Sequence, residues 1–483
     1  MGKLAALRFV EWLQKNSGWT LSLPTGKTPE HFIKWVTYLL NNWNSAPVRK
    51  ILEESSIDPA AKPDMRSFHF IQIDEFYPIN SWQHNSFYYY VNKYYIDGFG
   101  LDPQKAMLIN PNTIGLQEDM KLESIWPENK VDLSLRTRYP KNELEEKQKR
   151  VLGAIDQWCT DYEARIRKLG GIGFFLGGIG PDGHIGFNVK GSDHYSTTRL
   201  TETNYETQAA AATDLGGIEV SRHRLVITIG LQTIVFSPDT TAIIIAAGEA
   251  KAKIVREAIE SEKNNEIPAS ILQELDNSAF YLTQGAAKLL TERRHRMFAS
   301  LEKLNEDHKL QIVTDCSLAL NRRAVDLTKK DFNLTKTGKL LTARVPNNLE
   351  AYLRQVEDHF KSKIFEGLVS VKNQVFLHTA PHHDDIMLGY LPYLVRLMRE
   401  PTNTHFFNYL TSGFTAVTNS FMLKQNTNAE RFFNLPEFKA LLEDDYFDPA
   451  NLVYRNRDVL QFLDGLAADS REEMNAALYQ ESG

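Results

Sequence analysis

The sequence has little cysteine, no long apolar run and no excess of basic charge. Its 483 residues include only two cysteines, Cys159 and Cys316, which lie far apart. This pair excludes a disulfide framework and a cysteine-based zinc site, and it fits a reducing compartment. The net charge of −6 gives no reason to expect nucleic-acid binding. No apolar run approaches the length that spans a bilayer, so we expect no membrane partner and a cytoplasmic location.

The length of the chain exceeds what one hydrophobic core usually supports, so at least two domains are expected. Short apolar segments alternate with helical patterns through the first part of the chain. This alternation predicts an α/β fold with a mainly parallel, Rossmann-like sheet flanked by helices. We therefore predict a first domain at 1–295, a charged helical connector at 296–370 and a second, partial α/β domain at 371–483.

Residues 171–188, GIGFFLGGIGPDGHIGFN, pass from an apolar run into glycines and then to Asp182 and His184. An apolar run that ends in glycines predicts a buried strand that enters a tight loop. Ligands of α/β sheets bind at the carboxyl ends of the strands. An acid and an imidazole at such a place indicate proton transfer, and an ordinary turn with surface polar residues is the alternative.

A second strand, loop and helix pattern surrounds Thr25, Gly26, Lys27 and Thr28. The strand is predicted at Trp19–Leu23, and a helical pattern follows the loop. Small residues before a helix offer backbone N–H groups to an anion, and the lysine adds positive charge. The alternative is a proline-bounded helix start that Thr28 caps.

The same pattern recurs at Gly248, where a strand is followed by glycine and then by a helix whose first turn holds Lys251. A lysine in a first helical turn opposes the helix dipole. A contact with an anion is therefore a more natural role for Lys251 than a structural one.

Two acids, Asp74 and Glu75, directly follow the predicted strand His69–Ile73. Charges avoid the edge of a core unless they are used or paired. Adjacent residues of a strand point to opposite faces. We therefore expect Asp74 to face a cleft while Glu75 is held structurally, and a solvated turn is the alternative.

Near the C-terminus, the predicted strand Gln374–Leu377 leads to His382, His383, Asp384 and Asp385. A histidine and an aspartate three residues apart can share a metal ion, and the aspartate between them can act as a base toward bound water. A catalytic zinc would need at least one more ligand from elsewhere in the chain.

Four motifs together resemble the glucosamine-6-phosphate deaminases. They are LPTGKTP at 23–29, IDEF at 73–76, GIGPDGHIGFN at 178–188 and GEAK at 248–251. The superfamily also holds sugar-phosphate lactonases, and the IGFN segment favours the deaminase branch. The resemblance implies a small-molecule sugar phosphate as substrate, no cofactor for this domain, and conversion of glucosamine 6-phosphate to fructose 6-phosphate and ammonia. A homo-oligomer is left open.

The resemblance also implies roles for individual residues. Asp74 would be the base that moves a proton between C1 and C2, and Asp182 and His184 would belong to the group that opens the sugar ring. The phosphate- and substrate-binding residues would be Thr25, Gly26, Lys27, Thr28, Gly178, Gly180 and Lys251.

The sequence departs from the deaminase pattern at Val189, where the family has a glutamate that orients the histidine. His184 is therefore expected to lack a carboxylate partner unless Asp193 reaches it. Two alternatives stay open for this reason. One is a non-catalytic sugar-phosphate-binding domain, and the other is a lactonase, which needs the histidine but not the glutamate.

The motif PHHDDIMLG at 381–389 resembles the signature of zinc-dependent N-acetylglucosamine deacetylases (LmbE/PIG-L-like). This resemblance implies that His382 and Asp385 bind zinc and that Asp384 is the base. The third ligand of that family, a histidine further along, is expected beyond residue 483. The sequence thus predicts a deaminase-like domain fused to a partial deacetylase-like domain with an incomplete zinc site.

Overall fold

The computed structural model describes residues 1–460, except for 118–119, 206, 209–220, 222–223, 346–347, 370, 383, 412–417, 447, 449–450, 455 and 458–459. The chain divides into two compact units. One comprises Met1–Arg323 with Leu327–Leu349, and the other comprises Ala324–Asp326 with Glu350–Gly483. This division does not reproduce a separate connector at 296–370, because most of its helices group with the first unit. The three predicted domains stay a prediction.

The first unit contains most of the regular structure. Its helices are α1 (Gly2–Lys15), α2 (Glu30–Asn41), α3 (Ala46–Glu54), α4 (Phe87–Val91), α5 (Leu122–Ile125), α6 (Glu143–Lys168), α9 (Leu231–Ile234), α10 (Ala252–Glu260), α11 (Thr291–Ser300), α12 (Glu306–Leu320), α13 (Lys329–Phe332) and α14 (Lys336–Arg344). Its strands are β1 (Thr20–Ser22), β2 (His69–Ile71), β3 (Asp74–Tyr77), β4 (Ala106–Met107), β5 (Phe174–Gly178), β6 (Arg199–Thr201), β7 (Leu225–Thr228), β8 (Thr241–Ala246) and β9 (Ser278–Leu282).

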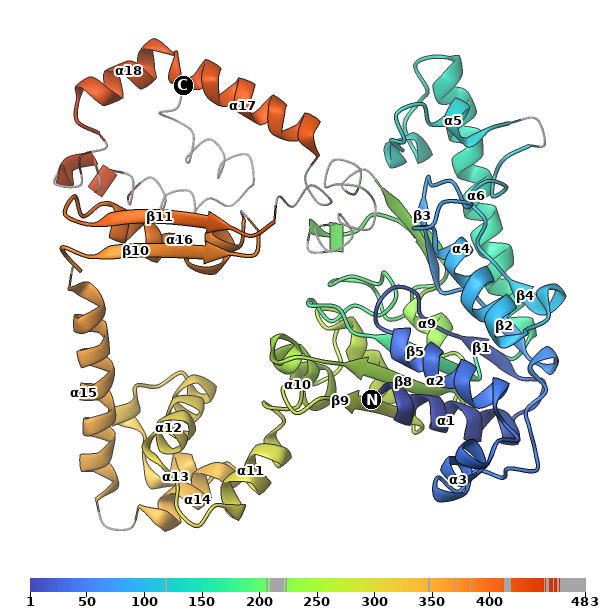
Figure 1. Ribbon diagram of the computed structural model, residues 1–483, viewed down its shortest axis with the longest axis horizontal. Coiled ribbons are helices and arrows are strands. Elements are labelled where there is room, and N and C mark those ends of the chain that lie inside the picture. Colours follow the sequence, from blue (N-terminus) through green and yellow to red (C-terminus); the bar gives the residue numbers. More distant parts are fainter. Residues whose placement is uncertain are drawn as a thin grey trace. The chain divides into compact units, whose positions relative to one another are not determined.

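Six strands form a parallel sheet in the order β4-β2-β1-β5-β8-β9, which confirms the predicted fold class (Figure 1). The chain builds outward from the centre of this sheet in both directions, so β1 and β5 lie at its topological switch point. Ligands of open α/β sheets bind outside the carboxyl ends of the strands at this point. The loops that follow β1 and β5 are the two glycine-containing loops that the sequence singles out.

A second, antiparallel sheet has the order β3-β7-β6. The apolar strand β7 pairs with β3 and β6 in this small sheet, since an apolar run does not reveal its pairing partner. One alternative drawn from the sequence is excluded here. Asp74 and Glu75 are buried residues of β3, so the solvated-turn alternative is wrong.

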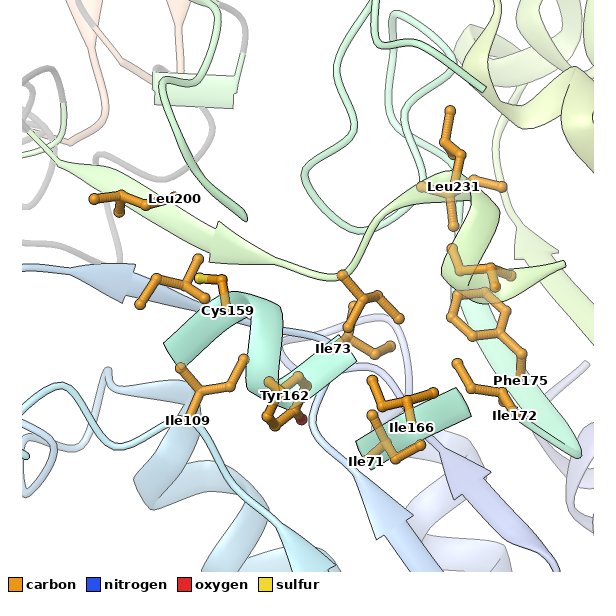
Figure 2. Packing of buried hydrophobic residues seen from close by; sticks show 14 of the residues in the cluster. Ile71, Ile73, Ile109, Cys159, Tyr162, Ile166, Ile172, Phe175, Leu200 and Leu231 are labelled. Carbon is orange, nitrogen blue, oxygen red and sulfur yellow. The ribbon is translucent and has the colours of Figure 1, made fainter. Parts of the chain in front are cut away.

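Helices cover both faces of the parallel sheet, and β5 shows why. Phe174 and Leu176 point to one face, where they pack in a cluster with Phe9 of α1. Phe175 points to the other face, where it belongs to a cluster with Tyr162 of α6 (Figure 2). A strand that is apolar on both faces is typical of a buried parallel sheet. The central strands are therefore packed on both faces.

The second unit contains a parallel pair of strands, β10 (Val375–Ala380) and β11 (Thr404–Tyr409). Its helices are α15 (Leu349–Leu368), α16 (Asp385–Met398), α17 (Asn419–Phe433) and α18 (Pro436–Glu443). The order β10-α16-β11 is a β–α–β unit, as expected for a partial α/β domain. No helix in the described part of the chain is long and apolar enough to cross a membrane.

Candidate active site

A cavity of about 570 Å³ in the first unit gathers the residues singled out from the sequence. Its lining includes Thr25, Lys27, Thr28, Asp74, Gly178, Gly180, His184 and Lys251. Of the predicted residues of this site, Gly26 and Asp182 do not line the cavity. The structure thus brings together segments that lie more than 200 residues apart, at the switch point of the sheet.

The loop between β1 and α2 forms one wall of this cavity. Gly26 has a φ of +81°, a conformation that favours glycine. The hydroxyl of Tyr90 donates a hydrogen bond of 2.9 Å to the Gly26 carbonyl. Pro29, not Thr28, precedes the first helical residue of α2, so the capping alternative for Thr28 is wrong. The Thr28 hydroxyl therefore does not cap α2, and it can serve an anion together with backbone N–H groups of the loop.

Lys251 brings a second cation to the cavity. It ends a short 3-10 turn, Glu249–Lys251, and immediately precedes α10. Burial lowers the pKa of Lys251, and the negative charge of Asp182 opposes this effect. A half-buried lysine at the start of a helix is well placed for an anionic ligand, because the anion would satisfy both the lysine and the helix dipole.

Asp74 is the buried acid of the site, with 7% of its surface exposed. It is the first residue of β3 and pairs with Thr228 of β7. Burial raises the pKa of Asp74 to about 8, and the neighbouring Glu75 contributes to the rise. A carboxyl group in such surroundings is a stronger base, once ionised, than an ordinary aspartate.

Glu75 points away from the cavity, as the strand alternation predicts. Its carboxylate accepts hydrogen bonds from Phe76 N at 2.9 Å, Phe87 N at 3.1 Å, Tyr88 N at 2.6 Å and Ser86 Oγ at 2.7 Å. Burial raises the pKa of Glu75, and these hydrogen bonds oppose the rise. Glu75 thus holds the start of α4, including Phe87, which lines the cavity.

His184 has a carboxylate partner after all. Its Nδ1 lies 2.6 Å from Asp182 Oδ1. The expectation that only Asp193 could fill this role is wrong. Asp193 instead accepts a hydrogen bond from the backbone of Tyr195. The sequence did not reveal the pairing, because a turn must fold the acid back onto an imidazole two residues away.

Asp182 is itself held by two donors. Its Oδ2 accepts hydrogen bonds from Lys190 N at 3.0 Å and from Asn204 Nδ2 at 2.7 Å. Burial alone would raise the pKa of Asp182, but the hydrogen bond and charge of His184, together with these two donors, lower it well below its usual range. Asp182 is therefore an ionised, fixed acceptor for the imidazole.

Gly180 makes room for the imidazole. A Cβ atom on this residue would lie 2.1 Å from His184 Cε1, which is a steric overlap. The Gly180 N–H also donates a hydrogen bond of 2.9 Å to the His184 carbonyl. The predicted substrate-binding role of Gly180 is untested, but the structure gives it a clear task in placing the histidine.

Replacement of Gly180 by alanine is expected to displace the His184 ring, since overpacking forces side chains out of position. Any reaction that uses this imidazole should then be slowed by about 10-fold or more. Steady-state kinetics with thermal melting checks this expectation. Gly153→Ala is the matched control, because nothing lies within 4 Å of a Cβ at this position in α6. Equal turnover in both variants would contradict the role given to Gly180.

Sequence reasoning missed a network that fixes the loop after His184. Asn188 is fully buried and donates to the carbonyls of Ile185 at 3.0 Å and Ile229 at 2.9 Å. Arg199 Nη1 donates to Asn188 Oδ1 at 2.9 Å. The asparagine of the IGFN segment therefore ties the His184 loop to the end of β7. A lone asparagine in a loop gives no such signal in a sequence.

In the histidine–aspartate cluster of the second unit, the described residues form hydrogen bonds with one another. His382 Nδ1 is hydrogen-bonded to Asp384 Oδ1, and the His382 N–H donates to Asp385 Oδ2 at 2.9 Å. His383 lies outside the described residues. Among the residues that the structure describes, no group of three or more His, Cys, Asp or Glu side chains could hold a metal ion. The zinc site stays a prediction, and these donors do not form one by themselves.

Comparison with known proteins relates the N-terminal region to glucosamine-6-phosphate deaminases, although no family model matches the chain. The deaminase of Clostridium perfringens (strain SM101 / Type A) is 27% identical over 290 residues, which are 60% of this chain and 95% of that protein. The deaminase of Shouchella clausii is 27% identical over 296 residues, which are 61% and 94% of the two chains. Glucosamine-6-phosphate deaminase 2 of Bacillus subtilis is 38% identical over 137 residues, or 28% and 54%.

Solved structures give weaker matches. A monomeric glucosamine-6-phosphate deaminase has 22% identity and a TM-score of 0.43, and the match covers 60% of this chain and 95% of that one. The 6-phosphogluconolactonase of Leishmania guyanensis has 13% identity and a TM-score of 0.38, with 60% and 94% covered.

Proposed function

We propose that the first unit converts glucosamine 6-phosphate to fructose 6-phosphate and ammonia by isomerisation and deamination. One observation carries the proposal. A buried acid, Asp74, and an imidazole, His184, which is hydrogen-bonded to Asp182, line the same cavity as a loop and a lysine suited to a phosphate. The similarity of the N-terminal region to glucosamine-6-phosphate deaminases supports the same function.

The phosphate would bind first and fix the position of the sugar. The loop Thr25–Thr28 offers backbone N–H groups and hydroxyls, and Lys27 and Lys251 supply positive charge. A fixed phosphate holds the reacting carbons at a constant place in the cavity. Such positioning is worth several orders of magnitude in rate, because it removes the entropy of bringing the groups together.

His184 would open the sugar ring. With Nδ1 hydrogen-bonded to the carboxylate of Asp182, Nε2 is the nitrogen left to exchange a proton with the substrate. The proton moves from the C1 hydroxyl to the ring oxygen O5, the C1–O5 bond breaks, and an open-chain aldehyde results.

Asp74 would then move a proton from C2 to C1. The C2 proton goes to C1, and a proton passes from the amino nitrogen to the C1 oxygen, so the amino aldehyde becomes the isomeric imine at C2 with a hydroxyl group at C1. Water adds to this imine and ammonia leaves, which gives fructose 6-phosphate. The overall reaction therefore consumes one water and needs no oxidant. Asp74 suits the step because its raised pKa makes it a competent base.

The direct test gives the purified protein glucosamine 6-phosphate in one assay and a sugar-phosphate lactone in another. Ammonia release from the first substrate supports the proposal. Lactone hydrolysis without ammonia would favour the lactonase alternative, which has no use for a buried base at Asp74. Binding of the sugar phosphate without turnover would favour the non-catalytic alternative.

Replacement of Lys251 by alanine is expected to raise the KM for glucosamine 6-phosphate by about 10- to 100-fold, because a charge-assisted contact is worth about 1.5–3 kcal/mol. The kcat should change much less, since Lys251 holds the phosphate rather than the reacting carbons. Lys253→Ala on α10 is the control, because this side chain is 76% exposed. An unchanged KM in Lys251→Ala would rule out the phosphate role.

For the second unit we propose a deacetylase-like domain, supported by the motif at 381–389 and the β–α–β unit around it. A deacetylase would yield the free amine that the first unit removes, so the two activities would act in sequence. A bound zinc ion, a homo-oligomer and a cytoplasmic location stay predictions.

A further inference from the structure

We propose that Asn204 is a positioning residue of the proton-transfer site. It holds Asp182 in one orientation, and Asp182 in turn determines which nitrogen of the His184 imidazole faces the substrate. The proposal rests on the proposed deaminase function for its effect on rate. Its structural part, the state of the imidazole, does not depend on that function.

The orientation of the Asn204 amide is fixed by its neighbours. Its Oδ1 accepts a hydrogen bond of 3.0 Å from the backbone N–H of Thr207, so the other end of the amide must be the NH₂ group. Nδ2 then donates 2.7 Å to Asp182 Oδ2. The Asn204 carbonyl also accepts a hydrogen bond of 2.9 Å from the Gln208 backbone. The asparagine is therefore held at both its side chain and its backbone.

Asn204 fixes the carboxylate of Asp182, and this carboxylate in turn fixes the imidazole. With Oδ2 engaged by Asn204 and by the backbone of Lys190, the carboxylate presents Oδ1 to His184 Nδ1 at 2.6 Å. An ionised carboxylate only accepts hydrogen bonds, so Nδ1 must carry the proton. Nε2 then keeps its lone pair for the substrate, as general base catalysis requires.

The charged groups around the imidazole come from several elements. Lys27 and His31 line the same cavity from the β1–α2 region, Asp74 lines it from β3, and Lys251 lines it beside α10. None of these side chains is hydrogen-bonded to Asp182 in the described residues, whereas Asn204 is. Asn204 therefore has a distinct task that the cavity residues do not share.

This arrangement also explains how His184 can be oriented although Val189 stands where the resemblance predicts a glutamate. A valine cannot accept a hydrogen bond from an imidazole, and in the structure Asp182 is the carboxylate that bonds to His184 Nδ1. Besides the histidine, Asn204 is a side-chain donor to Asp182. The loop after β6 thus supplies rigidity where a second carboxylate is missing.

Two variants test the proposal by kinetics. Asn204→Ala removes the donor. Asn204→Asp keeps the acceptor for Thr207 but sets a carboxylate against Asp182, and two carboxylates so close cannot both be ionised. Both variants should lower kcat by about 10- to 100-fold, the usual cost of losing an outer contact to an active group. KM should change by less than about 3-fold, because Asn204 does not line the cavity.

Asn142→Ala is the matched control. Asn142 accepts a hydrogen bond from the Glu145 backbone at the start of α6, three residues on, just as Asn204 does from Thr207. The control therefore loses the same kind of local contact far from the cavity. Its kcat should stay within about 2-fold of the parent, and an equal fall in both alanine variants would point to a merely structural effect and overturn the proposal.

The ¹⁵N chemical shifts of the His184 ring give a readout without any substrate. The parent protein should show one tautomer with the proton on Nδ1, and Asn204→Ala should show a mixture. An unchanged tautomer in that variant overturns the proposal, as does an unchanged kcat in an active enzyme. If the parent releases no ammonia, the proposed function fails, and the ring shifts alone decide the role of Asn204.

Discussion

Replacement of Asp74 by asparagine is expected to lower the turnover of glucosamine 6-phosphate by about 10²- to 10⁴-fold, the usual range for a lost general base. The amide has almost the shape of the carboxyl group, but it cannot take the C2 proton. KM should change little, because the phosphate contacts are untouched. Ammonia release under saturating substrate measures the effect, with the exposed Asp97→Asn as control. Unaltered turnover would mean that another group is the base.

Asp74 also gives the parent protein an expected pH dependence. Because the pKa of Asp74 is raised to about 8 in the folded protein, this base becomes ionised only as the pH passes that value, so the turnover of the parent protein should rise around pH 8. Folding has the opposite dependence. Between the ordinary pKa of an aspartate and about 8, the native state binds more protons than the unfolded state, so this residue makes stability fall as pH rises.

Thermal melting across this pH window separates the two effects. Asp74→Asn should melt at a higher temperature than the parent near pH 8, and its melting temperature should depend less on pH. A variant that is both less active and less stable at every pH would indicate a structural defect and not the loss of a base.

Replacement of Asp182 by asparagine is expected to lower turnover by about 10³- to 10⁴-fold through the wrong tautomer of the histidine. The amide oxygen would face the two donors, Lys190 N and Asn204 Nδ2, which now bind Oδ2. The NH₂ group would then face His184 Nδ1 and force the ring proton onto Nε2. Nε2 could no longer accept a proton from the substrate.

The ¹⁵N shifts of the ring and the kinetics check this expectation together. The proton should move from Nδ1 to Nε2 in Asp182→Asn, with kcat reduced and KM nearly unchanged. A reduced kcat with the tautomer of the parent would show that Asp182 acts through its charge, and a rise in KM alone would place it in substrate binding.

The sequence predicted the central sheet and most of the cavity, for local physical reasons. Apolar runs that end in glycine, such as Ile172–Gly178, mark buried strands that enter tight loops, and strands that alternate with helices pair in parallel. The carboxyl ends of such strands share one edge, so Thr25–Thr28, His184 and Lys251 had to lie near each other. Asp74 and Glu75 separated as strand alternation requires.

Tertiary contacts that local patterns do not encode were missed. The sequence points to Val189 and Asp193 for the partner of His184, whereas the chain folds Asp182 back onto the imidazole and holds it with Asn204. The pairing of β7 with β3 could not be predicted from the sequence for a similar reason, since an apolar strand can pair in any sheet. The role of a loop residue such as Asn204 depends on the distant residue that it contacts in the fold, here Asp182.

The helical region after the first predicted domain combines a charged sequence with buried positions. Its charged, helical sequence predicted a connector over 296–370, because a solvated face and a packed face differ by only a few apolar residues. In the structure Phe298, Ile312 and Phe332 are buried, and the segment up to Leu349, apart from Ala324–Asp326, groups with the first unit.

The central claim is tested most directly by the products formed from glucosamine 6-phosphate. The account predicts that the purified protein releases ammonia and fructose 6-phosphate in equal amounts, and that Asp74→Asn releases both at least about 10²-fold more slowly under the same conditions. No ammonia from the parent protein, or equal release from the parent and Asp74→Asn, would contradict it.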